Sequence, residues 1–144
     1  MSETDCIFCK IAHGEIPSKK IHEDENVVAF LDLSQVTPGH TLIIPKAHVR
    51  NIYDYDEALA EKVFRVIPKI ARALRNFRPD VAGLNIINNN EPVAYQSVFH
   101  SHIHLIPRYS DADEFGLKWS NHADQYTDDD LEKIMHAIQK ELGE

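Results

Sequence analysis

Three histidines alternate in the segment His100-Ser101-His102-Ile103-His104, and they are the residues of this chain best suited to chemistry. On a β-strand, successive side chains point to opposite faces, so the three imidazoles would share one face and Ile103 would point into a core. A lone histidine is most often a surface or a satisfied core residue. Three in register serve no packing need, so the segment predicts a functional site.

Two kinds of site fit these histidines. A metal bound by all three is disfavoured, because His100 and His104 would lie roughly 13 Å apart on a strand, whereas zinc–nitrogen bonds are about 2.0–2.1 Å long. Neighbouring rings could still share a metal. Alternatively the roles divide, with one ring attacking, another contacting a phosphate or a leaving group, and the third serving the structure. Imidazole suits attack on phosphorus because it is neutral near pH 7, with an ordinary pKa of about 6.5.

Cys6 and Cys9 are the two cysteines of the chain, and they are three positions apart. In a short helix over residues 6–13 they would share a face, since residues three apart are neighbours on a helix. In a protein without a secretory signal, this spacing indicates metal or redox chemistry more than a structural disulfide. A pair of buried thiols without a metal is the alternative.

The composition is that of one soluble domain, so residues 1–144 are predicted to form a single unit. A net charge of -8 disfavours nucleic acid as a partner, because binding to it depends on Lys and Arg. A small phosphorylated ligand needs only a few N–H groups and histidines. The acidic N-terminus does not resemble a signal peptide, and no apolar run predicts a membrane span. We therefore expect a cytoplasmic protein without a membrane partner.

The elements that must position these residues are strands and helices in mixed order. Strands are predicted over 20–24, 26–33, 40–44, 82–88 and 97–106. Apolar residues at spacings of three and four predict a long helix over 55–76, with a kink or break at Pro68. A last helix begins after Thr127 or Asp128 and has the apolar stripe Leu131, Ile134, Met135, Ile138 and Leu142. The predicted class is α+β, an antiparallel sheet with one long and one C-terminal helix.

The histidine segment resembles the signature of the histidine triad (HIT) family, in which three histidines alternate with hydrophobic residues. Ser101 takes the first hydrophobic position, which is a departure from the pattern. The similarity extends, in order and spacing, to CIFCKI, GEIPSKKIHEDENVVAFLDLSQVTPGHTLIIPKAHV, GLNIINNN and QSVFHSHIHLIPRY. Agreement over so much of the chain is specific, and it implies a single HIT-like domain.

The resemblance implies a homodimer that binds a purine nucleotide in a groove on the sheet. His102 would attack the α-phosphorus to form a nucleotidyl-histidine, which water then hydrolyses, and His104 would position the α-phosphate. Asn89 and Ser97 match family positions that touch phosphate and the bridging or leaving atom. The register among residues 88–90 is open by one, and Ser97 is alternatively the start of a strand.

Further family positions concern the nucleoside. Asp32 matches the carboxylate that holds the ribose hydroxyls, Gln96 belongs to the nucleotide site, and Ile11 and Phe30 match residues that line the base pocket. Asp32 is alternatively a turn residue, and Ile11 and Phe30 are alternatively plain core. Relatives usually carry glycine where this chain has Tyr95, so its leaving-group specificity is expected to differ from that of the commonest members.

In the same frame, His48 and His100 complete a Cys₂His₂ set with Cys6 and Cys9, which is a standard closed zinc site. Zinc-containing HIT proteins and galactose-1-phosphate uridylyltransferases resemble this arrangement, with the histidine two residues before the nucleophile as a ligand. The resemblance thus implies a structural zinc that anchors the catalytic strand rather than touching substrate.

The resemblance as a whole implies a Hint-like hydrolase of nucleoside 5′-phosphoramidates, with dinucleoside polyphosphates as the next substrate class. A nucleotidyltransferase that uses the same intermediate and a slow nucleotide-binding signalling module are the alternatives. The dimer contact is expected at the helix over 55–76 and the strand over 82–88.

Overall fold

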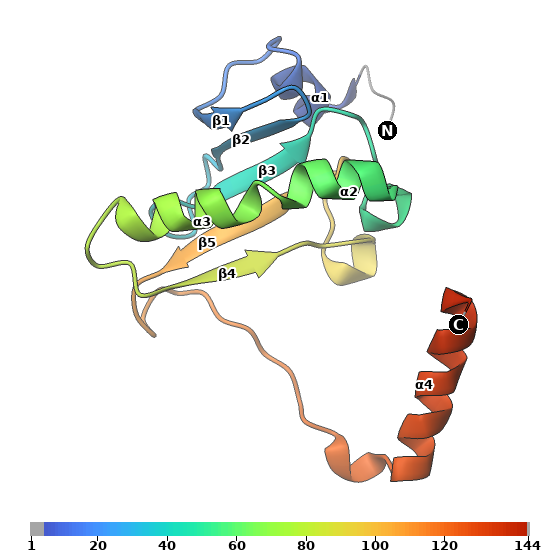
Figure 1. The fold of residues 1–144 in the computed structure, drawn as a ribbon. Coiled ribbons are helices and arrows are strands. Elements are labelled where there is room, and N and C mark those ends of the chain that lie inside the picture. The colour runs from blue at the N-terminus through green and yellow to red at the C-terminus, as the bar shows by residue number, and fades with distance from the viewer. Residues whose placement is uncertain (1–4, 144) are drawn as a thin grey trace.

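A computed structural model describes residues 5–143, and an antiparallel sheet of five strands forms its centre (Figure 1). The strands lie in the order β1-β2-β3-β5-β4. Their bounds are Lys20–Glu23 for β1, Val27–Leu31 for β2, Thr41–Pro45 for β3, Gly83–Ile87 for β4 and Ile103–Arg108 for β5. The α+β class predicted from the sequence is confirmed.

Side-chain alternation in the central strands produces one core on each face of the sheet. Val27 and Ala29 of β2 point to the face covered by the helices α2, Glu57–Phe64, and α3, Ile67–Asn76. Val28 and Phe30 point to the opposite face, which the short helix α1, Ile7–Ala12, covers. Burying one such side chain contributes about 1.5–3 kcal/mol, so both cores hold the strands in register.

The predicted long helix is two helices in succession. α2 ends at Phe64, α3 begins at Ile67, and Pro68 lies in the first turn of α3. Proline is tolerated there because the first turn has no intrahelical partner for its missing N–H. The break expected at Pro68 is confirmed.

The histidine segment departs from the predicted strand over 97–106, because β5 begins at Ile103. His100 and His102 precede the strand, so the prediction that they share a strand face with His104 is wrong. The backbone before β5 has partners outside the sheet, since the N–H of Ser101 donates to the carbonyl of Val49 at 2.8 Å. Ile103 itself is buried in the core as predicted.

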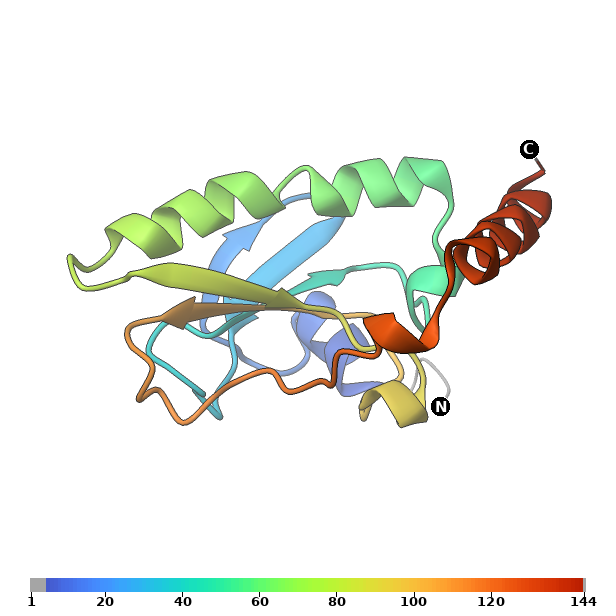
Figure 2. The same ribbon diagram turned by 90° about the horizontal axis from the view of Figure 1, so that it is seen from below.

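Helix α4, Asp128–Leu142, stands apart from the sheet, beyond the edge strand β4 (Figures 1 and 2). Thr127 caps it and forms a capping box with Asp130, which confirms one of the two predicted caps. Short 3₁₀ helices occupy Ile52–Asp54, Pro92–Ala94 and Ala123–Gln125. Within residues 5–143, no helix is long and apolar enough to cross a bilayer.

Candidate functional site

The ring of His102, the predicted nucleophile, is fixed by the backbone. Its Nδ1 lies 2.8 Å from the carbonyl oxygen of His100. A carbonyl only accepts, so Nδ1 carries the hydrogen, and Nε2 of the neutral ring carries a free lone pair. Burial lowers the pKa of His102, against upward effects of the His100 carbonyl and the charge of Asp32. The ring is therefore neutral at pH 7, with Nε2 free to attack.

His104 has the opposite arrangement, and His40 imposes it. Nδ1 of His40 accepts the backbone N–H of Val36 at 3.2 Å, so the hydrogen of His40 sits on Nε2. This hydrogen is donated to Nδ1 of His104, 2.9 Å away. His104 consequently carries its own hydrogen on Nε2. Burial lowers the pKa of His40 and lowers that of His104 to about 4, so both rings are neutral at pH 7.

These two histidines form a matched pair. The ring centroids of His102 and His104 are 5.1 Å apart. One ring offers a bare lone pair and the other offers an N–H donor. Displacement at phosphorus needs these two functions, a nucleophile and a donor for the charge that develops on oxygen.

Asp32 lies beside this pair at the end of β2. Its Oδ1 accepts the N–H of Ser34 at 2.8 Å, so the carboxylate does serve the turn. Its Oδ2 lies 3.7 Å from Nε2 of His40. Potential metal-ligand atoms of Asp32, His40 and His104 lie within 4.8 Å of one another. The hydrogen bond between His40 and His104 already engages one nitrogen of each ring. The contact of Asp32 with a ribose stays a prediction.

The three asparagines after β4 differ in their hydrogen-bond partners. The side chain of Asn88 donates to the carbonyl of His102 at 2.9 Å and holds the backbone of the nucleophile. The side chain of Asn90 donates to Asn88 and accepts the N–H of Ile52. No side-chain hydrogen bond of Asn89 is present within the described residues. Its amide is available for a phosphate, and that role stays a prediction.

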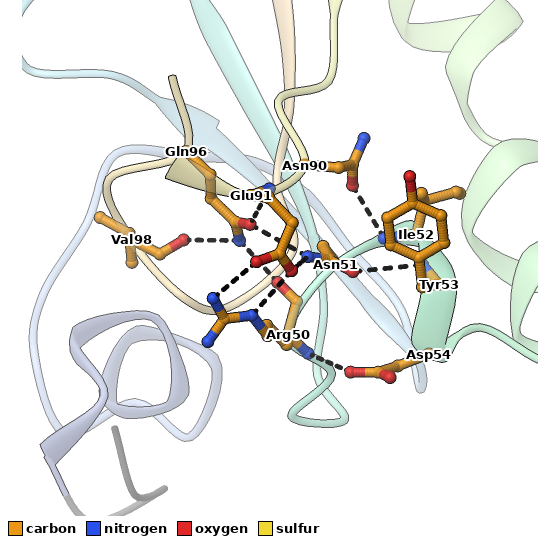
Figure 3. A network of polar contacts seen from close by, with 9 residues as sticks. All are labelled: Arg50, Asn51, Ile52, Tyr53, Asp54, Asn90, Glu91, Gln96 and Val98. Atoms are coloured by element: carbon orange, nitrogen blue, oxygen red, sulfur yellow. Dashed lines mark hydrogen bonds and ion pairs between the residues drawn. The ribbon is translucent and has the colours of Figure 1, made fainter. Parts of the chain in front are cut away.

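Gln96 is buried, and its side chain connects the loop between β4 and β5 to Arg50 and Asn51 (Figure 3). Its Nε2 donates to the carbonyls of Arg50 at 2.7 Å and Val98 at 3.1 Å. Its Oε1 accepts the backbone N–H of Glu91 at 2.8 Å and the amide of Asn51 at 3.2 Å. Both hydrogens and both oxygen lone pairs of the Gln96 amide are therefore engaged in hydrogen bonds within the protein. Its predicted place in the nucleotide site stays a prediction, and it would act through the shape of the loop.

The same loop holds two residues other than glycine with positive φ. Tyr95, with φ 71° and ψ 19°, is left-handed, whereas Glu91, with φ 78° and ψ 153°, is extended with positive φ. Each conformation costs about 1–3 kcal/mol for a side chain with Cβ. The carboxylate of Glu91 accepts two hydrogen bonds from Arg50, at 2.9 and 3.0 Å, and one from Asn51 at 2.6 Å (Figure 3). Such charge-assisted bonds offset the strain. Tyr95 therefore takes the backbone conformation that glycine favours.

The four predicted metal ligands lie close together in the structure. The donor atoms of Cys6, Cys9, His48 and His100 lie within 4.8 Å of one another. Nδ1 of His100 is 3.3 Å from the sulfur of Cys6 and 3.4 Å from that of Cys9, and Nδ1 of His48 is 3.2 Å from the sulfur of Cys9. A tetrahedral zinc would separate sulfur and nitrogen ligands by about 3.5 Å. The residues therefore fit a zinc ion.

His100 is prepared as a ligand by its second nitrogen. Nε2 lies 2.8 Å from the carbonyl of Pro45 and donates to it, so Nδ1 faces the cysteines with its lone pair free. Burial lowers the pKa of His100 to about 4, which keeps the ring neutral as a metal ligand must be. The His100 carbonyl in turn fixes the ring of His102.

Helix α1 links the cysteines to the nucleophile through Phe8. The Phe8 ring contacts His100 and His102 edge to face, with centroids 6.0 and 5.1 Å apart. Ile11 and Phe30 lie in the same hydrophobic cluster as Phe8 and are buried, as their plain core alternative predicts. A role in lining a base pocket stays a prediction for both.

Ser97 and Ser101 have different surroundings. Ser97 is exposed and lies outside any strand, which contradicts the alternative that it starts one. Its contact with the leaving atom stays a prediction. Ser101 is buried, and its hydroxyl lies 2.9 Å from that of Tyr55. This hydrogen bond explains how a polar residue replaces the hydrophobic residue of the family signature.

Sequence reasoning missed His40, Asn88 and Glu91 as positioning residues. His40 falls at the start of the strand predicted over 40–44, directly after the Thr37-Pro38-Gly39 turn. Its partner is visible only once β3 and β5 pair, which places Leu42 opposite His104.

Comparisons with known proteins relate this chain to one family. The HIT domain family model matches residues 13–111. A solved HIT family member from Bacillus subtilis is 54% identical with a TM-score of 0.91, covering 94% of this chain and 96% of that one. A zinc-bound histidine triad protein from Mycobacterium smegmatis is 35% identical with a TM-score of 0.72, covering 86% and 88%.

A third relative is adenosine 5′-monophosphoramidase HNT1 of Candida albicans, which is 35% identical over 99% of this chain and 94% of its own. The family match spans the five strands, the hydrogen bond between His40 and His104, and the loop of Figure 3. The chain belongs to the HIT domain family.

Proposed function

We propose that this protein is a nucleotide hydrolase that cleaves the α-phosphorus bond of purine nucleoside 5′-phosphoramidates, with dinucleoside polyphosphates as a second substrate class. The observation that carries the proposal is that the neighbouring rings of His102 and His104 have opposite hydrogen-bond partners at Nδ1, which leaves a lone pair on Nε2 of His102 and a hydrogen on Nε2 of His104. The Candida relative is named as an adenosine 5′-monophosphoramidase, which supports the substrate class.

The reaction has two displacements at the α-phosphorus. Nε2 of His102 bonds to phosphorus while the bond to the leaving group breaks, and the leaving group departs with the electron pair and takes a proton from solvent. Nε2–H of His104 donates a hydrogen bond to the phosphoryl oxygen. Water then attacks phosphorus, the bond to His102 breaks, and the nucleoside monophosphate leaves as the proton of water returns to solvent.

The remaining predicted residues surround this centre in the proposal. Asn89 binds a phosphate oxygen with its available amide, and Ser97 contacts the leaving atom from its exposed position. Asp32 holds the ribose with Oδ2, because Oδ1 is engaged by Ser34. Ile11 and Phe30, both from the cluster around α1, contact the base.

We also propose that Cys6, Cys9, His48 and His100 hold one structural zinc. The approach of the four donor atoms and the zinc-bound relative support it. A closed four-ligand site leaves no position for substrate, so the metal supplies rigidity rather than chemistry. Its ligand His100 fixes His102 through a carbonyl, so metal binding and nucleophile placement are coupled.

The protein is proposed to act as a homodimer of single-domain chains in the cytoplasm, with no nucleic-acid or membrane partner. Among the strands that the structure describes, β4 pairs with β5 alone and forms an edge of the sheet, and Ile86 on it is 53% exposed. An open edge of this kind is a template for a second strand. Pairing of β4 with β4 of a second copy would close it and bring the α2–α3 face to the contact, as predicted for residues 55–76 and 82–88.

Turnover of a substrate panel by His102→Ala and His102→Gly tests the function. With adenosine 5′-phosphoramidate, both variants should lose at least about 10³-fold in kcat, and added imidazole should restore part of the activity of His102→Gly. Circular dichroism and AMP binding serve as controls for folding and for the nucleotide site. Near-wild-type turnover by folded His102→Ala would refute the mechanism, and faster transfer to phosphate than to water would favour a transferase.

A further inference from the structure

Helix α4 carries an apolar stripe that the rest of residues 5–143 leaves uncovered. Its members are between 44% and 68% exposed: Leu131, Ile134, Met135, Ile138 and Leu142. None of the residues of α4 is buried. A helix with one apolar stripe packs that stripe against another element, so α4 needs a partner surface.

Acidic residues border the stripe on both sides. At about 100° per residue, Asp128 and Glu132 lie along one edge of the stripe, and Glu141 lies along the other. Lys133 and Lys140 lie on the opposite face of the helix. The partner surface for this stripe should therefore be apolar with basic margins.

The groove between α3 and β4 has this character. Its volume is about 290 Å³, and Ala71, Val81 and Leu84 contribute apolar surface to it. Arg72 and Arg75 line the same groove, and neither forms an ion pair within the described part of the chain. Apolar contact at the centre with opposite charges at the rim is the usual design of a protein interface.

The segment before α4 is directed past β4 by Arg108 at the end of β5. Arg108 donates to Asp113 at 2.9 Å, to the side chain of Asn85 in β4 at 2.8 Å, and to the carbonyl of Phe115 at 2.8 Å. These bonds fix the first part of the connection against the edge strand. α4 then stands beyond that edge and rises from the level of the sheet toward that of α2 and α3 (Figures 1 and 2).

The groove of the same chain lies at the wrong end for α4. The end of α3 and the start of β4 lie on one side of the molecule, whereas α4 stands on the other side, near the end of β4 (Figures 1 and 2). Antiparallel pairing of two β4 strands about a two-fold axis places the start of the second β4 beside the end of the first. That pairing brings the groove of a second copy to the side where α4 stands.

We propose that α4 docks in trans, with its apolar stripe in the α3–β4 groove of a second copy and its acidic margins on Arg72 and Arg75. The docking is reciprocal, so a dimer contains two such contacts. The inference rests on the proposed homodimer and extends its interface to a helix outside the matched residues 13–111.

Photo-crosslinking of the full-length, zinc-loaded chain tests this docking. Benzoylphenylalanine replaces Met135 in the stripe, and a matched variant carries it in place of Lys140 on the opposite face. After irradiation, the Met135 variant should give a covalent dimer on a denaturing gel, with the crosslink mapped by mass spectrometry to residues 69–84. The Lys140 variant should give at least about tenfold less of this product, as expected when one face contacts the groove.

A charge reversal supplies the second arm. Arg72→Glu combined with Arg75→Glu should lower the Met135 crosslink several-fold, and adding Glu132→Arg and Glu141→Arg should restore it. A crosslink to residues 69–84 within one chain, crosslinks to another surface, or equal yields from both positions would overturn docking in trans. Light scattering and adenosine 5′-phosphoramidate turnover are measured in parallel. A dimer without the crosslink then refutes the docking alone, and loss of the catalytic mechanism is seen separately in the His102 variants.

Discussion

The rings of His102 and His104, whose centroids are 5.1 Å apart, differ at Nε2, which carries a lone pair in the first and a hydrogen in the second. Two fixed groups impose this difference. The carbonyl of His100 accepts a hydrogen bond from Nδ1–H of His102, and Nε2–H of His40 donates a hydrogen bond to Nδ1 of His104. The family signature alone does not distinguish the two rings, whereas their hydrogen-bond partners do.

His40 should therefore act as a positioning residue. His40→Phe removes the donor to His104 and should lower kcat by about 10–100-fold, with a smaller change in KM. His40→Gln keeps an N–H donor and should recover part of the loss. Steady-state kinetics of both variants over pH check this, and equal losses in the two would indicate that the hydrogen bond is irrelevant.

The buried neutral state of His104 predicts a stability that depends on pH. Its pKa is lowered from 6.5 to about 4 in the folded protein, mainly by burial. Between these values the unfolded chain binds more protons, so stability should fall as the pH falls from 6.5, and this loss should end near pH 4. Burial lowers the pKa of His40 and acts in the same direction.

Urea unfolding of wild type and His104→Gln at pH 5 and pH 7 measures this effect. The variant should lose less stability between the two pH values, by up to about 1.4 kcal/mol per pH unit. His136→Gln, which removes a histidine of helix α4 instead, serves as the matched control. Parallel pH dependence in wild type and His104→Gln would contradict the assignment.

Zinc removal should affect stability before chemistry. Protein purified without chelator should contain one zinc per chain, and chelation should lower Tm by roughly 5–15 °C. The ligands must be deprotonated, so zinc should be lost as pH falls. Cys6→Ser combined with Cys9→Ser should melt at the lower temperature and ignore the chelator. Elemental analysis that finds far less than one zinc per chain, or an unchanged Tm in the variant, would refute the proposed zinc site.

The left-handed backbone at Tyr95 predicts an unusual response to glycine. Tyr95 has φ 71° and its side chain is 85% exposed, so Tyr95→Gly should relieve strain and lose few contacts. The free energy of unfolding should rise by up to about 1 kcal/mol. Tyr95→Ala keeps the strain and should leave stability unchanged. Denaturant titration compares the two, and an equal response would show that φ is not the cause.

Local patterns in the sequence predicted most of the fold. The strand ranges, the helix break at Pro68 and the cap at Thr127 follow from periodicity, from the geometry of proline and from capping chemistry, which act within a few residues. The strand over 97–106 was wrong in its first half because Ser101 bonds to Val49, a contact across 52 positions of chain. No local pattern contains such a partner.

The candidate site shows the same division. The spacing of Cys6 and Cys9 indicates metal or redox chemistry, and the resemblance to the HIT family adds His48 and His100 as ligands. The structure brings a potential ligand atom of each of the four residues together. The role of His40 depends on the pairing of β3 with β5, and that of Glu91 on Arg50, 41 positions away. Positioning residues lack a sequence signature because any hydrogen-bond donor or acceptor of suitable length can serve in that role. Cytoplasmic location and the nucleotide contacts stay predictions.

The central claim is that Nε2 of His102 bonds to the α-phosphorus. Rapid acid-free quench of wild type mixed with adenosine 5′-phosphoramidate, followed by mass spectrometry of the intact chain and its peptides, tests it directly. The account predicts an adenylyl adduct that forms and decays within one turnover, that maps to His102, and that is absent from His102→Ala. An adduct on another residue, or turnover by wild type with no adduct at any time, would contradict it.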